Sequence, residues 1–228
     1  MWVGGGGPEP AGFCLRLRFI ITGQGACAVN TPGALFIVSA PSGAGKTSVV
    51  NAALARAAGV ARTVSHCTRS PREGEVDGVD YHFVSPERFE AMRAAGEFAE
   101  SAQVFGNEYG TAMVTVRRIL DRGDQAVSVI DWQGANQLRE RFPDAVKIFI
   151  APPGLDVLAA RLRARATDSE AVIRRRLAQA ELDMAQARTY DYLVVNDRFE
   201  AAVQDMLAIW RSVPLRIDRQ GALALSGV

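Results

Sequence analysis

Lysine is nearly absent from this sequence. Lys46 and Lys147 are the only two lysines, and arginine supplies the rest of the 26 basic side chains. A genomic preference for arginine codons accounts for such a bias without any functional cause. Against that background Lys46 stands out, because it follows a glycine-rich run where a compact ammonium group suits the binding of phosphate.

Cysteine is also scarce. Cys14, Cys27 and Cys67 are odd in number and widely spaced, and they form no CxxC pair. This pattern argues against a disulfide framework and against a zinc site built on cysteines. It favours a protein of the reducing cytoplasm, which is the location we expect.

The chain lacks both a strong net charge and a long apolar run. Its formal net charge of +1 at pH 7 gives no global attraction to nucleic acid or to a membrane surface, so we expect neither as a partner. The most apolar early stretch, residues 13–22, is short and is interrupted by Arg16 and Arg18, unlike a membrane span. It also fits a signal peptide poorly, because no positive charge precedes it. Any anion-binding site must therefore be local.

The segments of the chain differ clearly in composition. Residues 1–33 are rich in glycine and proline without a sustained period, which predicts a disordered leader or a mis-assigned start. Residues 34–62 and 113–213 alternate apolar strands with helices, an order typical of an α/β fold with a parallel sheet flanked by helices. Residues 63–112 predict a small mixed α/β insertion, and residues 214–228 a C-terminal tail.

Local signals predict the individual elements. A helix is expected to open at Ser85-Pro86, and capping-box spacing at residues 167–170 predicts the start of another helix, which runs to about residue 188. The other expected helices are 47–58, 114–122, 136–141, 155–165 and 199–213. The expected strands or extended pieces are 35–38, 63–68, 81–84, 98–105, 109–111, 126–130, 146–150 and 192–195.

The first expected strand runs into a loop that follows the P-loop pattern G-x-x-x-x-G-K-[ST], except that Ala40 replaces the first glycine. Alanine is tolerated at that position if its φ is negative. Gly43 and Gly45 allow backbone N–H groups to approach phosphate oxygens, and the helix that follows adds its N-terminal dipole. The motif predicts a P-loop NTPase core that binds a nucleoside triphosphate through Ala40, Pro41, Ser42, Gly43, Ala44, Gly45, Lys46, Thr47 and Ser48.

Two side chains of this loop carry specific chemistry. Lys46 is expected to reach the β- and γ-phosphates, and the hydroxyl of Thr47 is expected to bind Mg²⁺. A glycine-rich turn without a ligand is the alternative, which the apolar strand before the loop and the helix after it disfavour. The motif alone leaves motors, switches, transporters and kinases open.

A second polar cluster suggests a site for another phosphate. Arg69 and Arg72 flank Pro71, whose ring stiffens their spacing. A guanidinium fork pairs bidentately with phosphate, and a tyrosine hydroxyl can add a further contact. A solvated charged loop would have the same composition, so these residues alone leave both interpretations open.

Several motifs together resemble the signature of guanylate kinases. The longest spans residues 64–84 and reads V-S-H-C-T-R-S-P-R-x-G-E-x-x-G-x-D-Y-x-F-V. Shorter pieces agree in order at 106–111, 130–135 and 194–197, so the resemblance covers about residues 34–212. It implies that the protein transfers a phosphoryl group from ATP to GMP or dGMP by direct in-line transfer, with Mg²⁺ as the cofactor, and that the reaction serves guanine nucleotide recycling. We expect a monomer or a homodimer.

The resemblance also assigns roles residue by residue. The positions that hold the GMP phosphate in the family correspond to Ser65, Arg69, Arg72, Tyr81 and Tyr109. The positions that read guanine or orient the acceptor correspond to Glu75, Glu100, Thr111 and Asp131. Guanine presents N1–H and N2–H₂ as donors, so a carboxylate such as Glu100 can accept both, while the Thr111 hydroxyl can serve O6. A site built on such pairs rejects the wrong base, because a mismatch leaves buried polar groups unpaired.

An arginine-rich segment at about residues 156–188 matches the helical lid of the family. Arg161 and Arg165 are four residues apart on one predicted helix face, and Arg176 lies in the next helix. Solvated helix surface is the common alternative for such runs. Phosphoryl transfer needs cations around its transition state once water is excluded, and the resemblance gives that role to these arginines. The catalytic residues it implies are Lys46, Arg69, Arg161, Arg165 and Arg176.

Two positions depart from the family pattern. Ala166 follows the lid arginine where glycine is usual, which predicts a slightly stiffer hinge. Val129 stands where relatives usually have an acid, which predicts a weaker hold on Mg²⁺ or a larger share of it for Asp131.

Two other functions are alternatives to the kinase. A related sugar-phosphate kinase would keep the P-loop without the guanine-reading residues. A non-catalytic binding module of the same family typically has an eroded loop. The near-intact loop, together with Glu75, Tyr81, Glu100 and Thr111, disfavours both.

Overall fold

The central strand of the molecule is β1 (Leu35–Ser39), an apolar segment in which every residue is buried. In the computed structural model, which describes residues 33–104, 106–164, 169–216 and 219, this strand pairs in parallel with a neighbour on each side. Burial on both faces explains why the segment has a continuous apolar run without alternation.

Five parallel strands make the main sheet, in the order β2-β7-β1-β8-β9. The strands beside β1 are β2 (Val60–Arg62), β7 (Gln125–Val129), β8 (Val146–Ala151) and β9 (Tyr192–Val195). Because all of them are parallel, their carboxyl ends meet at one edge of the sheet, where α/β folds bind their ligands. The predicted α/β class, with a parallel sheet flanked by helices, is confirmed.

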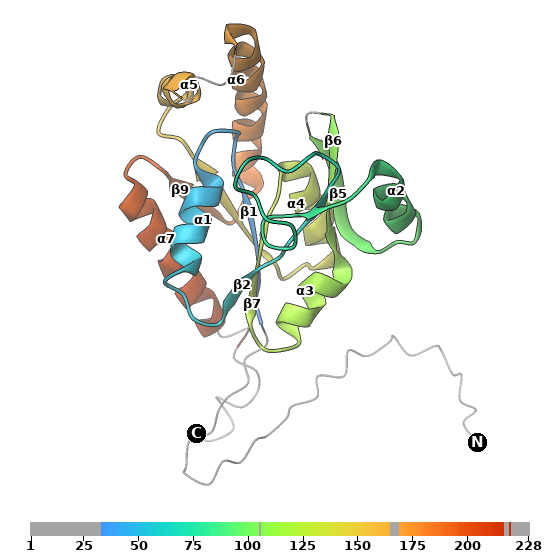
Figure 1. The fold of residues 1–228 in the computed structure, drawn as a ribbon. Coiled ribbons are helices and arrows are strands. Elements are labelled where there is room, and N and C mark those ends of the chain that lie inside the picture. The colour runs from blue at the N-terminus through green and yellow to red at the C-terminus, as the bar shows by residue number, and fades with distance from the viewer. Residues whose placement is uncertain (1–32, 105, 165–168, 217–218, 220–228) are drawn as a thin grey trace, which may run out of the picture. The chain divides into compact units, whose positions relative to one another are not determined.

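Helices cover both faces of this sheet (Figure 1). On one face α1 (Lys46–Leu54) and α7 (Phe199–Ser212) pack together over β1, and Trp210 lies against Phe36 with a ring separation of 6.2 Å. On the other face lie α3 (Met113–Leu120) and α4 (Trp132–Arg141). The two apolar layers fix the sheet and, with it, the loops at its carboxyl edge.

A separate four-stranded sheet has the order β4-β3-β6-β5. Its elements are β3 (His66–Cys67), β4 (His82–Phe83), β5 (Phe98–Val104), β6 (Asn107–Ala112) and the helix α2 (Pro86–Ala94). Helix α2 begins as predicted, with Ser85 as its N-cap and Pro86 in its first turn. Gly110 is required here, since a Cβ on it would lie 2.9 Å from the Phe98 ring.

Two further helices, α5 (Leu155–Ala164) and α6 (Glu170–Ala185), pack on each other through Leu158, Leu162 and Ile173. The predicted capping box is wrong in one respect. Helix α6 begins at Glu170, and its N-cap is Ser169, whose hydroxyl accepts from the Val172 N–H. Ser169 already accepts from one of the free N–H groups of the first turn, so the helix begins there without the box two residues earlier.

Other elements differ from the expectation at their ends. Strand β2 was not expected, because three half-buried residues carry no periodicity. Helix α4 begins at Trp132, four residues earlier than expected, because the Asp131 side chain caps it by accepting from the Gly134 N–H. Helix α6 ends at Ala185, and the short 3₁₀ turns η1 (Gln186–Thr189) and η2 (Val213–Leu215) follow α6 and α7.

Some expectations fall outside the described residues. These are the leader up to residue 32, Arg165, Ala166 and most of the tail after 216. Within the part of the chain that the structure describes, no helix has the length and apolar character needed to cross a membrane.

Replacing Ile148 with alanine should lower the free energy of unfolding by about 2–5 kcal/mol, because the truncation leaves a cavity in the core. Ile148 is fully buried in β8, the strand next to the central strand β1. The matched control is Leu193→Ala on β9, where the side chain is 59% exposed and the expected change is below about 1 kcal/mol. Urea unfolding with an unchanged slope measures both, and equal losses would contradict this account of the core.

Candidate active site

The P-loop connects β1 to α1 and lies at the carboxyl edge of the main sheet. Gly43 and Gly45 have φ values of 94° and 91°, in the left-handed region that favours glycine. A Cβ on Gly45 would also lie 2.5 Å from the side-chain amide of Asn196. The loop therefore requires glycine at position 45 for two reasons, its backbone conformation and its close packing.

Asn196 braces this loop from the end of β9. Its side-chain amide donates to the Ala44 carbonyl over 2.7 Å, and its side chain is buried. Arg161 in turn donates to the Asn196 backbone carbonyl over 2.9 Å. The motif at residues 194–197 thus supports the loop, and Arg161 lies against this support in the structure.

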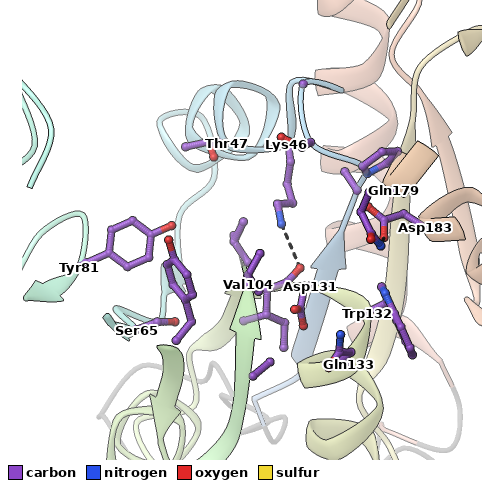
Figure 2. Close-up of a pocket in the computed structure, with 18 of the residues that line it drawn as sticks. Lys46, Thr47, Ser65, Tyr81, Val104, Asp131, Trp132, Gln133, Gln179 and Asp183 are labelled. Carbon is purple, nitrogen blue, oxygen red and sulfur yellow. Dashed lines mark hydrogen bonds between the residues drawn. The ribbon is translucent and has the colours of Figure 1, made fainter. Parts of the chain in front are cut away.

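The Lys46 side chain extends from the loop into a cavity (Figure 2). Its ammonium donates to the Ile130 carbonyl over 3.0 Å. Burial lowers the pKa of Lys46 to about 8, and the carboxylates of Asp131 and Asp183 oppose that shift. The ammonium stays largely charged at neutral pH and faces the space where a phosphate would lie.

The cavity has a volume of about 390 Å³. It joins the P-loop to residues of the smaller sheet and to the start of α4. Of the residues predicted from the sequence, those lining it are Ala40, Pro41, Ser42, Gly43, Gly45, Lys46, Thr47, Ser48, Ser65, Arg69, Arg72, Tyr81, Glu100, Tyr109 and Asp131.

Other predicted residues lie outside this lining. Ala44 of the loop is buried, and so is Thr111, whose hydroxyl is bonded to Glu100. Glu75 is bound to Arg69. Arg176 is half-buried on α6, whereas its neighbours Arg174 and Arg175 are exposed.

Arg69 is held by Glu75 in a two-point ion pair, with N···O distances of 2.6 and 2.7 Å. Glu75 also accepts from the Arg72 backbone N–H over 2.8 Å, and the Arg69 pairing lowers the pKa of Glu75 to about 2. The guanidinium of Arg69 lies 5.1 Å from the centre of the Tyr81 ring, and Tyr81 meets Tyr109 edge to face. Glu75 therefore orients the Arg69 guanidinium in this structure.

Glu100 lies at the end of a buried chain of hydroxyl groups. The Thr111 hydroxyl donates to Glu100 over 2.5 Å, and Ser65 lies 2.9 Å from the same hydroxyl. A Cβ on Gly134 would lie 2.3 Å from the second carboxylate oxygen, so glycine at 134 makes room for it. Burial raises the pKa of Glu100 to about 7, the Thr111 hydrogen bond opposes this, and Asp131 adds to it.

Asp131 both caps a helix and lines the cavity. It caps α4 through the Gly134 N–H at 2.8 Å, and it lines the cavity beside Lys46. Burial raises its pKa, while the bond from Gly134 opposes the shift. Its placement follows from β7, because the strand ends two residues earlier at the edge of the sheet.

The structure also brings residues to the cavity that the sequence reasoning missed. Gln179 and Asp183 come from α6, and Trp132 and Gln133 from the first turn of α4. The four-residue spacing of Gln179 and Asp183 places them on one helix face. Such spacing is common on solvated helices, so it does not indicate from the sequence that the two residues line a cavity.

The oxygen groups near the loop fit a hard divalent cation. Thr47 lies in the first turn of α1, is exposed, and lines the cavity. Hydroxyl and carboxylate oxygens are the donors that Mg²⁺ prefers when it arrives with phosphates. Val129 also lines the cavity and offers no such oxygen, which leaves Asp131 as the carboxylate at the end of β7.

Comparison with known proteins gives a consistent family. A family model described as guanylate kinase matches residues 33–212. The guanylate kinase of Alkalilimnicola ehrlichii is 50% identical over 192 residues, which are 84% of this chain and 95% of that relative. The guanylate kinase of Thiobacillus denitrificans is 51% identical over 190 residues, 83% of this chain and 91% of that relative.

A solved structure agrees with these relatives. The crystal structure of guanylate kinase from Anaplasma phagocytophilum superposes with a TM-score of 0.73 at 33% identity. The match covers 85% of this chain and 93% of that one.

Stability should fall with rising pH because of Glu100. Its folded pKa is raised from 4.5 to about 7, so its contribution to stability is complete below pH 4.5 and is lost as the pH rises through 7. Between about pH 5 and about pH 8 the wild type should lose roughly 2–3 kcal/mol relative to Glu100→Gln. Urea unfolding of both proteins at the two pH values measures this difference, and parallel pH profiles would refute it.

Proposed function

The chain belongs to the guanylate kinase family, and on that premise we propose that its cavity holds GMP opposite the triphosphate of ATP. The protein phosphorylates GMP to GDP with ATP as the donor. The observation that carries the site assignment is one cavity that joins Lys46 of the P-loop to the Arg69, Tyr81 and Glu100 side chains. A sugar-phosphate kinase or a non-catalytic module is not favoured.

The acceptor phosphate is assigned to the group of basic and hydroxyl side chains on the smaller sheet. Arg69 and Arg72 supply charge, and Ser65, Tyr81 and Tyr109 supply hydroxyl groups on the same side of the cavity. Glu75 supports this role indirectly, because its two-point pairing holds the Arg69 fork in one orientation.

Guanine is assigned to Glu100. An ionised Glu100 accepts from N1–H and N2–H₂ of guanine, which adenine does not present. The Thr111 hydroxyl donates to Glu100 and holds the carboxylate in place. To donate to guanine O6 instead, the Thr111 hydroxyl would have to rotate. The same reading applies to dGMP, because none of these contacts involves the ribose 2′-hydroxyl.

Transfer itself depends on positioning. The loop amides and Lys46 hold the donor phosphates, and the acceptor phosphate is already an anionic nucleophile, so no general base is needed. The lid arginines Arg161, Arg165 and Arg176 are assigned to the transferring phosphoryl group. Arg161 would leave the Asn196 carbonyl to reach it, a movement consistent with a lid that closes over bound substrates.

Mg²⁺ is the cofactor that ATP brings to such a site. Thr47 would hold it, with Asp131 as the nearby carboxylate at the edge of β7. When bound, the ion would neutralise part of the charge that develops on the β- and γ-phosphate oxygens.

Base selectivity tests the assignment of the acceptor. With ATP fixed, ADP release should be stimulated by GMP on the order of a thousandfold more efficiently than by AMP, CMP or UMP, because mismatched donors and acceptors stay unpaired. Glu100→Gln should lower kcat/KM for GMP by more than about tenfold while ATP affinity changes less than about twofold. Equal losses for both substrates would remove Glu100 from the role of base reader.

Lys46→Ala tests the donor half separately. Loss of the ammonium should reduce kcat by at least about a hundredfold, because one preorganised cation is removed from the developing charge. GMP binding, measured by calorimetry without ATP, should stay within about threefold of wild type, since the acceptor groups lie on other elements. A parallel loss of GMP binding would show that Lys46 supports the whole cavity instead.

A further inference from the structure

One wall of the cavity comes from the lid-bearing helix α6. Gln179 and Asp183 are its two lining residues, and the Gln179 side-chain amide donates to the Asp183 carboxylate over 3.0 Å. Asp183 is half-buried, whereas Glu181 and Leu182 beside it are exposed. Asp183 is thus the acidic residue in this part of α6 that lines the cavity.

Asp183 and Asp131 lie on different sides of the Lys46 ammonium (Figure 2). Asp131 lies below it at the start of α4, and Asp183 lies on the side away from Tyr81 and Ser65. Both carboxylates act on Lys46 electrostatically, and the charge of Asp131 also contributes to the raised pKa of Asp183, after burial. The hydrogen bond of the ammonium goes to the Ile130 carbonyl, so the carboxylates attract it through space.

A carboxylate beside a phosphate site is unfavourable unless a cation separates the two charges. The Lys46 ammonium is such a cation, because it extends from the loop that holds the donor towards the two acids. With Asp131 alone, attraction would draw the ammonium towards the start of α4. A second acid on a different side offsets part of that attraction and helps to fix the position of the ammonium.

We propose that Asp183 is a positioning residue for phosphoryl transfer, which acts from helix α6 to hold the Lys46 ammonium between the donor and acceptor phosphates. This inference rests on the proposed function of the cavity. Asp183 acts through Lys46 and does not itself bind either nucleotide.

The position of Asp183 on α6 links the lid to this lysine. Arg176 precedes Asp183 by seven residues, two turns along the same helix, so both lie on one face. A movement of α6 that carries Arg176 to the phosphates would therefore also move the acid that helps to position Lys46. Lid closure and the placement of the catalytic cation become parts of one motion.

The test is Asp183→Asn with Glu181→Gln as the matched control on the same helix. Asp183→Asn should lower kcat by about tenfold, a typical size for the coupling of neighbouring charged groups, with KM for GMP within about twofold. Glu181→Gln should leave both values unchanged, since its side chain is exposed. Asp183→Glu, which keeps the charge on a longer stem, should recover most of the lost kcat.

A double-mutant cycle identifies the group through which Asp183 acts. In a Lys46→Ala background, single-turnover rates should be the same with and without the Asp183→Asn substitution, because the positioned cation is gone. Thermal unfolding checks that each variant is folded. If Asp183→Asn fails to fold, Asp183→Gln, which also removes the charge, takes its place in both backgrounds.

The results that overturn the inference are distinct from those that overturn the function. Wild-type kcat in Asp183→Asn, equal losses in Asp183→Asn and Asp183→Glu, or a loss that persists without Lys46 would each refute the positioning role. Failure of the wild type to phosphorylate GMP would instead refute the proposed function itself.

Discussion

The hydrogen bond from the Asn196 side chain to the Ala44 carbonyl is the contact on which the donor site depends. A P-loop works by pointing its N–H groups inwards, so its carbonyls must find partners elsewhere, and a buried carbonyl without one is costly. Asn196 supplies that partner from the end of β9, and its close approach requires glycine at position 45. The backbone carbonyl of the same asparagine accepts from Arg161 of α5, so the loop, the last strand and α5 meet at one residue.

The cavity below this loop balances several buried charges. Glu100 is stabilised by Thr111 but still has a raised pKa, whereas Glu75 is fully paired with Arg69 and has a lowered pKa. These opposite shifts match different tasks. Glu100, which is proposed to accept hydrogen bonds from a base, has no ion-pair partner among the described residues, whereas Glu75 is paired with the arginine that it orients.

Much of this could be predicted from local sequence because the responsible signals are local. The apolar run at residues 35–38 and the glycines after it specify a strand, a turn and a helix start within a short stretch of chain. The cap at Ser85 and Pro86 is equally local. Prediction failed where a neighbour in space decides the outcome. Strand β2 is a strand because β7 lies beside it. The expected start of α6 was wrong for a local reason, because Ser169 caps the helix and the capping-box spacing favoured an earlier cap.

The sequence by itself determined the class of fold, the donor loop and the identity of the arginines and acids that the family motif contains. Those features depend on residue type and on spacing along the chain. Only the tertiary structure decided which acids face Lys46, that Glu75 pairs with Arg69, and that Asp183 of α6 lines the cavity. These outcomes depend on where parallel strands end and on how helices pack over them, which brings together residues as far apart in the chain as Lys46 and Asp183. Such separations leave no trace in the local pattern of a single sequence.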